Sequence, residues 1–357
     1  MKLTKIDERY LKDLTQIIAP SGVENDIATY LISEFKKMNL EIIKDNLGSV
    51  FALKKSKNPN AKKVMLCAHM DEVGFYVKNI LQNGMIKVVT IGGFNLSTLP
   101  SQRVILVNKN GKKFYGMVDA LPPHLLNGEQ KGIKEDDLLF DFGFKSKDEV
   151  LNNDVNIGDF IVCEGEFHYT FNEESIISKA IDDRAGLSLI MSSLNEILNT
   201  DLDYDLYIGG TVQEEVGCRG ALTSSYLIKP DVAIVVDVSP ARDSSSSDAI
   251  GKLGEGVLIR YFDRTMIANK KLLDLQIEAC KNVNAKYQYF DSPGGTDAGS
   301  IHKNLGGIFT LTHCICARSI HSASTLFRVS DYLAAKNSLI ELLTNILNSN
   351  LIEELKK

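Results

Sequence analysis

Histidine and carboxylate side chains occur in this sequence where short apolar runs end. His69 and Asp71 close one such run, Glu214 and Glu215 follow a second, and Asp237 lies near the end of a third. Each run has the length and composition of a buried parallel strand. Because ligands bind at the carboxyl ends of strands in an open α/β sheet, these side chains predict a functional site at that edge.

Two further segments supply side chains of the same kinds. Asp182 and Asp183 stand at the start of a helical pattern over 181–198, and His321 closely follows the last apolar run. Adjacent acids at the N-terminus of a helix are also stabilised by the helix dipole. The pair alone therefore leaves helix stabilisation and metal ligation both open.

Imidazole and carboxylate side chains without a thiolate are typical of zinc, cobalt or manganese in a catalytic site. Asp71 lies two residues after His69, on the same face of the strand, and can accept a hydrogen bond from the His69 ring. A metal-bound histidine usually has such a carboxylate partner. A buried histidine can also have this partner without any metal. Five ligands exceed what one catalytic zinc takes, whereas a carboxylate that bridges two ions about 3.5–4 Å apart uses them all. Of the neighbours Glu214 and Glu215, one would then bind metal and the other would act as a base.

The other histidines and the cysteines give weaker signals. A surface or structural role is favoured for His124 and His168, while His302 and His313 are secondary candidates for the site. The six cysteines form no CxxC pair, and the CxC at 314–316 is by itself a weak indication of zinc. The sequence contains no G-x-S-x-G, no H-E-x-x-H and no phosphate-binding loop.

Helical and strand patterns divide the chain into two kinds of segment. Helical periods alternate with apolar strands in 1–72 and 169–357, whereas 73–168 contains short strands separated by turn signals. We predict an α/β fold, a mixed and mostly parallel sheet sandwiched by helices, with a small β-barrel-like domain inserted at 73–168. The segment 21–24 has the form of a capping box, and 333–357 predicts an amphipathic helix.

Charge and hydropathy exclude some classes of function. The 357 residues include 40 lysines and arginines and 46 aspartates and glutamates, a net charge of −6. Nucleic acids and anionic membrane surfaces bind basic faces, so neither is an expected partner. The N-terminal residues lack the apolar run of a signal peptide, and no segment reaches the roughly 18 apolar residues of a membrane span. We expect a cytoplasmic protein.

Six motifs resemble, in their order along the chain, metallopeptidase family forty-two, which contains the glutamyl aminopeptidases and the tetrahedral (TET) aminopeptidases. They are AHMDEVGF, KAIDDRAG, VQEEVG, VVDVS, PGGTDAGSIH and RSIHS, and they span nearly the whole chain. The resemblance implies the dinuclear-metal aminopeptidase fold, with the inserted β domain serving in dimerisation. It implies two divalent ions per chain, zinc, cobalt or manganese. It implies that Asp182 bridges the two ions and is joined to Asp183 by a cis peptide bond. It places His69 and Asp237 on one ion, and Glu215 and His321 on the other. It makes Glu214 the general base and Asp71 the residue that orients His69.

The resemblance also implies an activity. A metal-activated water, with Glu214 as general base, would remove N-terminal residues from short peptides. Arg260 and Arg264 are candidates for a pocket that holds a glutamyl side chain, although either arginine can instead be structural. Thr296 and Asp297 are further candidates for substrate binding.

Several alternatives stay open. Ser319 follows Arg318 where many family members have tyrosine, and the stretch before it lacks a proline that relatives often carry, so lysyl, leucyl or broad neutral specificity competes with glutamyl specificity. A related dinuclear-metal deacylase or carboxypeptidase, and a catalytically inactive assembly protein, are the alternatives to an aminopeptidase. Self-association to dimers and to a tetrahedral dodecamer is implied by the resemblance alone.

Overall fold

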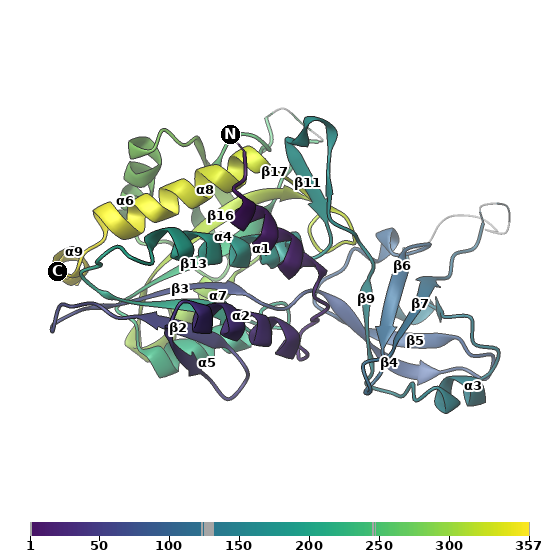
Figure 1. Cartoon of the computed structure of the whole chain (residues 1–357). Helices are drawn as coiled ribbons and strands as arrows, with labels where there is room; N and C mark the ends of the chain where they lie inside the picture. Colours follow the sequence, from purple (N-terminus) through teal and green to yellow (C-terminus); the bar gives the residue numbers. More distant parts are fainter. Residues whose placement is uncertain (1, 123, 125–131, 245, 247, 357) are drawn as a thin grey trace.

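The computed structural model describes residues 2–122, 124, 132–244, 246 and 248–356. They form a large mixed sheet covered by helices and, at one end of it, a closed β-barrel (Figure 1). The barrel is inserted between strands of the large sheet, so the sheet is assembled from segments on both sides of it in the sequence. The predicted fold class is confirmed.

The large sheet has the strand order β1-β2-β12-β3-β13-β16-β17-β11-β10, with β14 pairing with β15 and β16. Its central strands β12, β3, β13 and β16 are parallel. The pairings outside them are antiparallel, except that β15 runs parallel to β14. The bounds are β1 (Glu41–Lys44), β2 (Val50–Lys54), β3 (Lys63–His69), β10 (His168–Tyr169), β11 (Ser175–Ser178), β12 (Asp205–Thr211), β13 (Val232–Pro240), β14 (Val257–Asp263), β15 (Tyr287–Ser292), β16 (Phe309–Arg318) and β17 (Thr325–Arg328).

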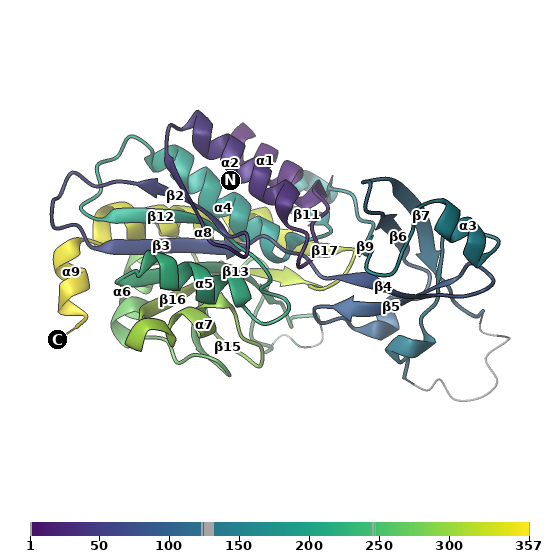
Figure 2. The ribbon, with the colours of Figure 1, turned by 90° about the horizontal axis from the view of Figure 1, so that it is seen from below.

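Alternate residues of the central strands enter two different cores. In β3, Val64 and Leu66 pack into the core beneath the N-terminal helices, whereas Met65 and Cys67 pack into the core on the opposite face. This alternation is the two-residue period of a strand buried on both faces, which is why β3 is apolar at nearly every position. His69 continues the second series, at the end of β3 that points toward the barrel (Figure 2).

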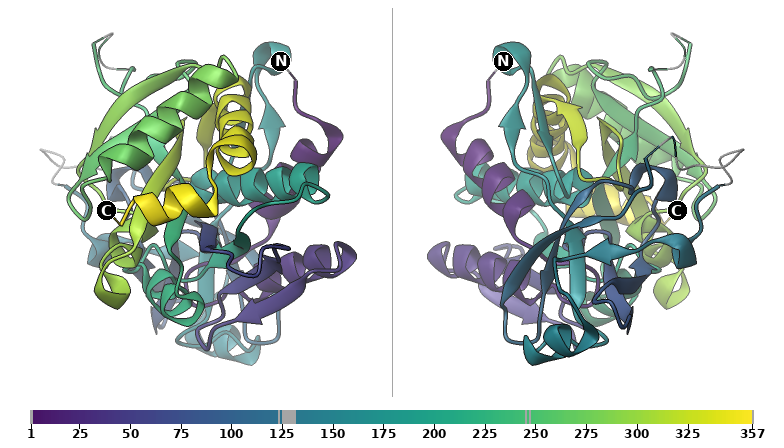
Figure 3. Two further views of the ribbon diagram at one scale, coloured as in Figure 1. Left: turned by 90° about the vertical axis from the view of Figure 1, so that its left-hand side faces the viewer. Right: turned by 90° about the vertical axis from the view of Figure 1, so that its right-hand side faces the viewer.

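Helices cover both faces of the sheet. The larger core is formed with α1 (Lys5–Gln16), α2 (Asn25–Lys37), α4 (Ile181–Ile197), α6 (Lys270–Asn282) and α8 (Val329–Glu341). The opposite face is covered by α5 (Arg219–Ile228) and α7 (Asp297–Ile301). End-on views show α6 and α8 stacked at the end of the molecule away from the barrel (Figure 3). No helix of the described residues is both long and apolar enough to cross a bilayer.

The barrel closes in the order β4-β5-β8-β7-β6-β9 around its own apolar core. Its elements are β4 (Gly74–Ile80), β5 (Ile86–Ile91), β6 (Arg103–Val107), β7 (Lys113–Val118), β8 (Phe140–Asp141), α3 (Lys147–Asn152) and β9 (Phe160–Cys163). Phe75 lies at the centre of this core, 5.0 Å from Phe140 and stacked at 4.6 Å on Phe94. The domain boundaries at 72 and 168 stay predictions, and His168 already pairs with the large sheet through β10.

Two local expectations are wrong. The C-terminal segment is not one helix, because α8 passes into a π-helical turn (Leu342–Ile346) and ends before α9 (Ser349–Glu354), whose N-cap Asn348 accepts from the backbone N–H of Leu351 at 2.9 Å. The segment 21–24 forms no capping box, because Glu24 makes no side-chain cap and Ser21 donates instead to Asp71 at 2.7 Å.

Two buried cations tie the N-terminal helix to the rest of the sheet domain. Arg184 is fully buried, and its guanidinium donates to the carbonyl oxygens of Leu14, Ile17, Ala19 and Met70 at 2.7 to 3.1 Å. Lys336, in α8, donates to Asp7 of α1 at 2.9 Å, and both side chains are nearly inaccessible to solvent. Each cation also has a carboxylate neighbour: Glu72 lies 3.7 Å from Arg184 and 2.7 Å from Lys179, and Glu196 lies 2.7 Å from Lys336.

Candidate functional site

His69 ends β3 with its ring held from one side. Its Nδ1 lies 3.0 Å from the backbone carbonyl of Asp71 and 3.6 Å from the Asp71 carboxylate, so the carbonyl is the closer acceptor. A proton on Nδ1 that is donated to this carbonyl leaves Nε2 unprotonated, the form that binds a metal. Nε2 lies 3.2 Å from Asp182.

The Asp71 carboxylate makes further contacts beside its position near His69, and its predicted role in orienting that ring stays a prediction. It accepts from the backbone N–H of Glu214 at 2.9 Å and of Glu215 at 3.1 Å, and from the Ser21 hydroxyl. Asp71 is fully buried, and these donors, with His69, keep its pKa below the ordinary value although burial alone would raise it. Asp71 therefore fixes the loop that carries both glutamates, while its carbonyl orients His69.

Asp182 lies between two histidines at the start of α4. Its Oδ1 faces His69 Nε2 at 3.2 Å, and its Oδ2 faces His321 Nε2 at 3.4 Å. Burial would raise the pKa of Asp182, but hydrogen bonds to His321 and His69 lower it below the usual range. The peptide bond between Asp182 and Asp183 is cis, as predicted. One carboxylate thus presents a separate oxygen to each of two imidazoles.

Glu215 completes the side of the site that contains His321. Its Oε1 lies 3.4 Å from His321 Nε2, and its side chain is 5% exposed. Burial and the charge of Asp182 raise the pKa of Glu215 to about 8. Burial lowers the pKa of His321, but Asp182, Glu215 and a hydrogen bond to the backbone of Gly93 raise it to about 9.

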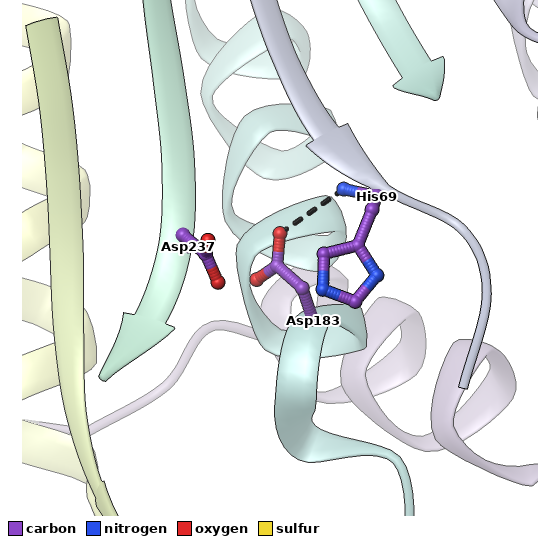
Figure 4. A group of neighbouring side chains, drawn as sticks. All are labelled: His69, Asp183 and Asp237. Atoms are coloured by element: carbon purple, nitrogen blue, oxygen red, sulfur yellow. Dashed lines mark hydrogen bonds between the residues drawn. The ribbon is translucent and has the colours of Figure 1, made fainter. Parts of the chain in front are cut away.

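Asp237 lies opposite His69 at the end of the neighbouring parallel strand. The β3–β13 register pairs Val235 with Cys67, and both strands continue to the site (Figure 4). Asp237 comes within 4.8 Å of ligand atoms of His69 and Asp183. Asp183, whose Oδ2 accepts from the His69 backbone at 3.2 Å, is a carboxylate that the sequence interpretation did not count among the ligands. Burial and neighbouring carboxylates raise the pKa of Asp237 to about 7.

Glu214 lies beside this cluster and has a neighbour that sequence reasoning missed. Burial raises the pKa of Glu214 well above its ordinary value. The Cys218 thiol donates to Glu214 Oε1 at 3.4 Å, and ligand atoms of Glu214, Cys218 and Asp297 lie within 4.8 Å of one another. Cys218 is the only one of the six cysteines that is not buried, but nothing in its sequence context marks it, because a lone cysteine usually acts as a small apolar residue.

The candidates for substrate binding lie in two kinds of place. Arg260 is 3% exposed and donates to Asp263, to Ser239 and to the carbonyl of Gly294. Arg264 is exposed. Thr296 is the N-cap of α7, and Asp297, 1% exposed, accepts from Thr211 at 2.5 Å. Their roles in substrate binding stay predictions.

His302 and His313 hydrogen-bond to backbone carbonyls, and the CxC lies in an apolar cluster. His313 is buried between Gln276 and the carbonyl of Ala335, both at 2.9 Å, and burial lowers its pKa to about 4. His302, the C-cap of α7, donates from Nε2 to the Thr265 carbonyl at 2.9 Å. Cys314 and Cys316 pack with Leu258 and Phe290 in a small apolar cluster.

The donor set fits divalent cations. Glu215 Oε1 and Asp297 Oδ1 are buried and have no hydrogen-bond donor among the described residues. Three carboxylates of the cluster, Asp183, Glu215 and Asp237, have pKa values raised chiefly by burial, with mutual repulsion adding to it. Buried carboxylates in excess of cationic partners require a proton or a metal ion. Imidazole and carboxylate ligands are suited to divalent metals in an open site.

The chain combines a mixed α/β sheet, an inserted barrel and a cluster of histidines and carboxylates at the strand ends. This combination defines a metal-dependent hydrolase of the aminopeptidase type. The model of the M42 glutamyl aminopeptidase family matches residues 48–337, and the chain belongs to this family. The chain is therefore an aminopeptidase, and both the family resemblance and the enzyme class predicted from the sequence are confirmed.

Relatives and solved structures cover the chain almost completely. Glutamyl aminopeptidase of Lactococcus lactis is 37% identical over 97% of this chain and 98% of its own length. Lysyl aminopeptidase of Pyrococcus furiosus is 32% identical over 91% of this chain and 93% of its own. The TET aminopeptidase of a marine sediment Thaumarchaeota archaeon superposes with a TM-score of 0.92 at 32% identity, covering 98% of this chain and 99% of its own. The Pyrococcus horikoshii TET1 peptidase can assemble into a tetrahedron or a large octahedral shell. It superposes with a TM-score of 0.85 at 26% identity, covering 95% of this chain and 99% of its own.

Proposed function

We propose that this chain is a dinuclear metal-dependent aminopeptidase that removes N-terminal residues from short peptides. The observation that carries the proposal is the position of Asp182, whose two oxygens face His69 at 3.2 Å and His321 at 3.4 Å. A carboxylate with one oxygen toward each imidazole suits a bridge between two ions. The proposal thus assigns a specific task to the most central carboxylate of the cluster.

The other ligands divide between the two ions. His69 and Asp237 would hold one ion, and Glu215 and His321 would hold the other, with zinc, cobalt or manganese as the metals that this donor set suits. Bound at these residues, the ions would polarise the scissile carbonyl and lower the pKa of the attacking water. Asp183, close to His69 and Asp237, is a further oxygen donor on the first side.

Glu214 is the general base of this proposal. It holds a carboxylate beside the ligand cluster, and its backbone N–H is fixed by Asp71 at 2.9 Å. Burial raises its pKa well above that of an ordinary glutamate, which makes the carboxylate a stronger acceptor for the proton of the attacking water. It would take the proton of the attacking water and return it to the leaving amine.

Glu214→Gln tests the assignment. The variant should keep both metal ions and the fold but lose about 10²- to 10⁴-fold in kcat, the usual contribution of a general base. Glu215→Gln is the matched control, because it should lose metal as well as activity. Turnover near the normal rate in Glu214→Gln would remove Glu214 from this role.

The substrate is an N-terminal residue with a free α-amine, and we propose an acidic one. The Lactococcus lactis glutamyl aminopeptidase supports this preference, and Arg264 offers an exposed guanidinium. A panel of aminoacyl-p-nitroanilides, with cobalt, zinc or manganese added to chelator-stripped enzyme, tests it. Release from Glu and Asp substrates, with a KM raised by Arg264→Ala, would support it. Release from Lys or Leu substrates would discard the acidic pocket, and cleavage of N-acetylated peptides alone would favour the deacylase alternative.

We also propose self-association through the barrel, up to a tetrahedral dodecamer. Tyr115 and Met117 of β7 are 63% and 42% exposed and, two residues apart on one strand, lie on the same face of the barrel. The assembly of the Pyrococcus horikoshii TET1 peptidase supports the proposal. A closed shell would admit short, unfolded peptides only.

A cytoplasmic location is part of the proposal. The six cysteines of the chain are free, and none is paired in a disulfide. Free thiols are the usual state in a reducing compartment. Fractionation of cells that express the untagged protein, with a periplasmic and a cytoplasmic marker, tests the location.

A further inference from the structure

Two glycines of the inserted barrel lie against the candidate metal centre. Gly92 and Gly93 directly follow β5, and the β4–β5 pairing of Gly74 with Ile91 places Gly92 beside Val73. A Cβ added at Gly92 would lie 2.7 Å from Val73 Cγ1, 3.2 Å from Glu215 Cβ and 3.3 Å from Glu215 Oε2. A side chain at this position of the barrel would therefore crowd both Val73 and a proposed metal ligand, and the absence of one leaves room for Glu215.

Gly93 contacts the other ligand on the same side. A Cβ at Gly93 would lie 3.5 Å from His321 Nδ1, and the Gly93 backbone is among the groups that raise the pKa of His321. The opposite ring nitrogen, Nε2, faces Asp182 and Glu215 at 3.4 Å each. A histidine ligand is commonly oriented by a neighbour on its other nitrogen, and Gly93 is the residue that lies beside Nδ1 of His321.

The turn is fixed firmly to the barrel. Phe94, the next residue, stacks on Phe75 with ring centroids 4.6 Å apart and planes 16° apart, and Phe75 is at the centre of the barrel core. Gly92 has a φ of +82°, a conformation that other residues adopt at a cost. The position of the two glycines is thus set by the packing of the barrel and not by the loops of the sheet domain.

The ligands of the other proposed ion are held differently. His69 and Asp237 sit on β3 and β13. Apart from the shared Asp182, their hydrogen bonds are with Asp71, Asp183 and the backbone of Val238. We propose that the Gly92–Gly93 turn is a positioning element for Glu215 and His321, so that the barrel sets the affinity of one of the two metal ions and leaves the other unaffected. This inference rests on the proposed dinuclear centre.

Gly92→Ala tests it, with Gly111→Ala as the matched control. Gly111 lies in another turn of the same barrel with a φ of +76°, and a Cβ there meets nothing within 4 Å. Both variants bear the cost of a left-handed alanine, but only Gly92→Ala crowds Glu215. Metal ions per chain are measured by mass spectrometry after equilibrium dialysis of the full-length proteins at graded free cobalt. Gly92→Ala should hold one ion as tightly as the wild type and the second about 10-fold or more weakly. Gly111→Ala should match the wild type.

The outcomes separate this inference from the function on which it rests. Two ions bound to Gly92→Ala with wild-type affinities would overturn the role of the turn. Fewer than two ions on the wild type at saturating cobalt would overturn the dinuclear centre itself, whatever the variants do. Should Gly92→Ala fail to fold, Gly93→Val, whose backbone lies outside the left-handed region, crowds the His321 ring directly and should weaken the same ion.

Discussion

Stripping the metal from this enzyme should make its unfolding free energy fall as the pH rises through neutrality. Glu215 has a pKa raised from 4.5 to about 8 in the folded chain, and His321 has one raised from 6.5 to about 9. Between pH 6.5 and 8 the folded state therefore holds protons that the unfolded chain has released. Unfolding free energy falls with rising pH wherever the folded state binds more protons.

The size of the effect follows from one extra proton. Each proton that the folded state holds in excess costs the protein about 1.4 kcal/mol of stability for every pH unit of increase. Over the 1.5 pH units from 6.5 to 8, Glu215 alone should lower the unfolding free energy by about 2 kcal/mol. His321 acts with the same sign, whereas the lowered pKa of Asp182 acts only in strongly acidic solution.

Urea unfolding of chelator-stripped protein at pH 6.5, 7.25 and 8 measures this. The chain contains no tryptophan and 12 tyrosines, so tyrosine fluorescence and far-UV circular dichroism are the two probes. Glu215→Gln should make the decline shallower, because the amide cannot titrate, although His321 and Asp237 still release protons in this range. Glu255→Gln, at an exposed glutamate paired with Lys286, should leave the decline unchanged. Saturating cobalt should abolish the decline in wild type, since the bound ion takes the place of the protons. A metal-free wild type whose stability stays level or increases from pH 6.5 to 8 would refute the reasoning.

Two further predictions concern the base and the barrel. Cys218→Ala should lower kcat about 3- to 10-fold with little change in KM, because the weak hydrogen bond that orients Glu214 is lost. Cys218→Ser should recover part of the rate. Equal rates in the alanine variant and the wild type would contradict this prediction. Tyr115→Glu should shift the assembly to smaller species in analytical ultracentrifugation, because it buries a charge in the proposed barrel interface, while the exposed Tyr226→Glu on α5 serves as control. An unchanged sedimentation profile for Tyr115→Glu would argue against the barrel as the interface.

Residues at strand ends were predictable because two regularities of parallel sheets act on them. Apolar runs revealed the strands, and carboxyl ends of parallel strands meet at one edge, so His69, Asp237 and the Glu214–Glu215 pair could be placed together without knowing the strand order. The register then brings Asp237 to the level of His69. The barrel was predictable for a similar reason, since turn residues at short intervals indicate hairpins.

Contacts between distant segments were not predictable from local patterns. The sequence around Ser21 has the pattern of a helix cap, but the Ser21 hydroxyl donates to Asp71, fifty residues away. The hydrogen bond to the distant residue forms in place of the local cap. Whether the carboxylate or the carbonyl of Asp71 meets His69 depends on the turn after β3, which its sequence does not specify. The contact of Gly92 with Glu215 joins two domains, and no periodicity within either domain reveals it.

The two buried cations that join α1 to the sheet domain have a practical consequence for anyone who shortens this enzyme. The segment that matches the family begins at residue 48, which invites removal of everything before it. Such a truncation would delete three of the four carbonyl acceptors of Arg184 and the Asp7 partner of Lys336. After the truncation Lys336 would keep only Glu196, and Arg184 would keep only the Met70 carbonyl and the more distant Glu72. A buried charge that loses its partner altogether costs about 3–5 kcal/mol, so the loss of most partners of two buried cations should destabilise the shortened chain markedly. Residue 48 is therefore a poor starting point for a shorter version of this enzyme.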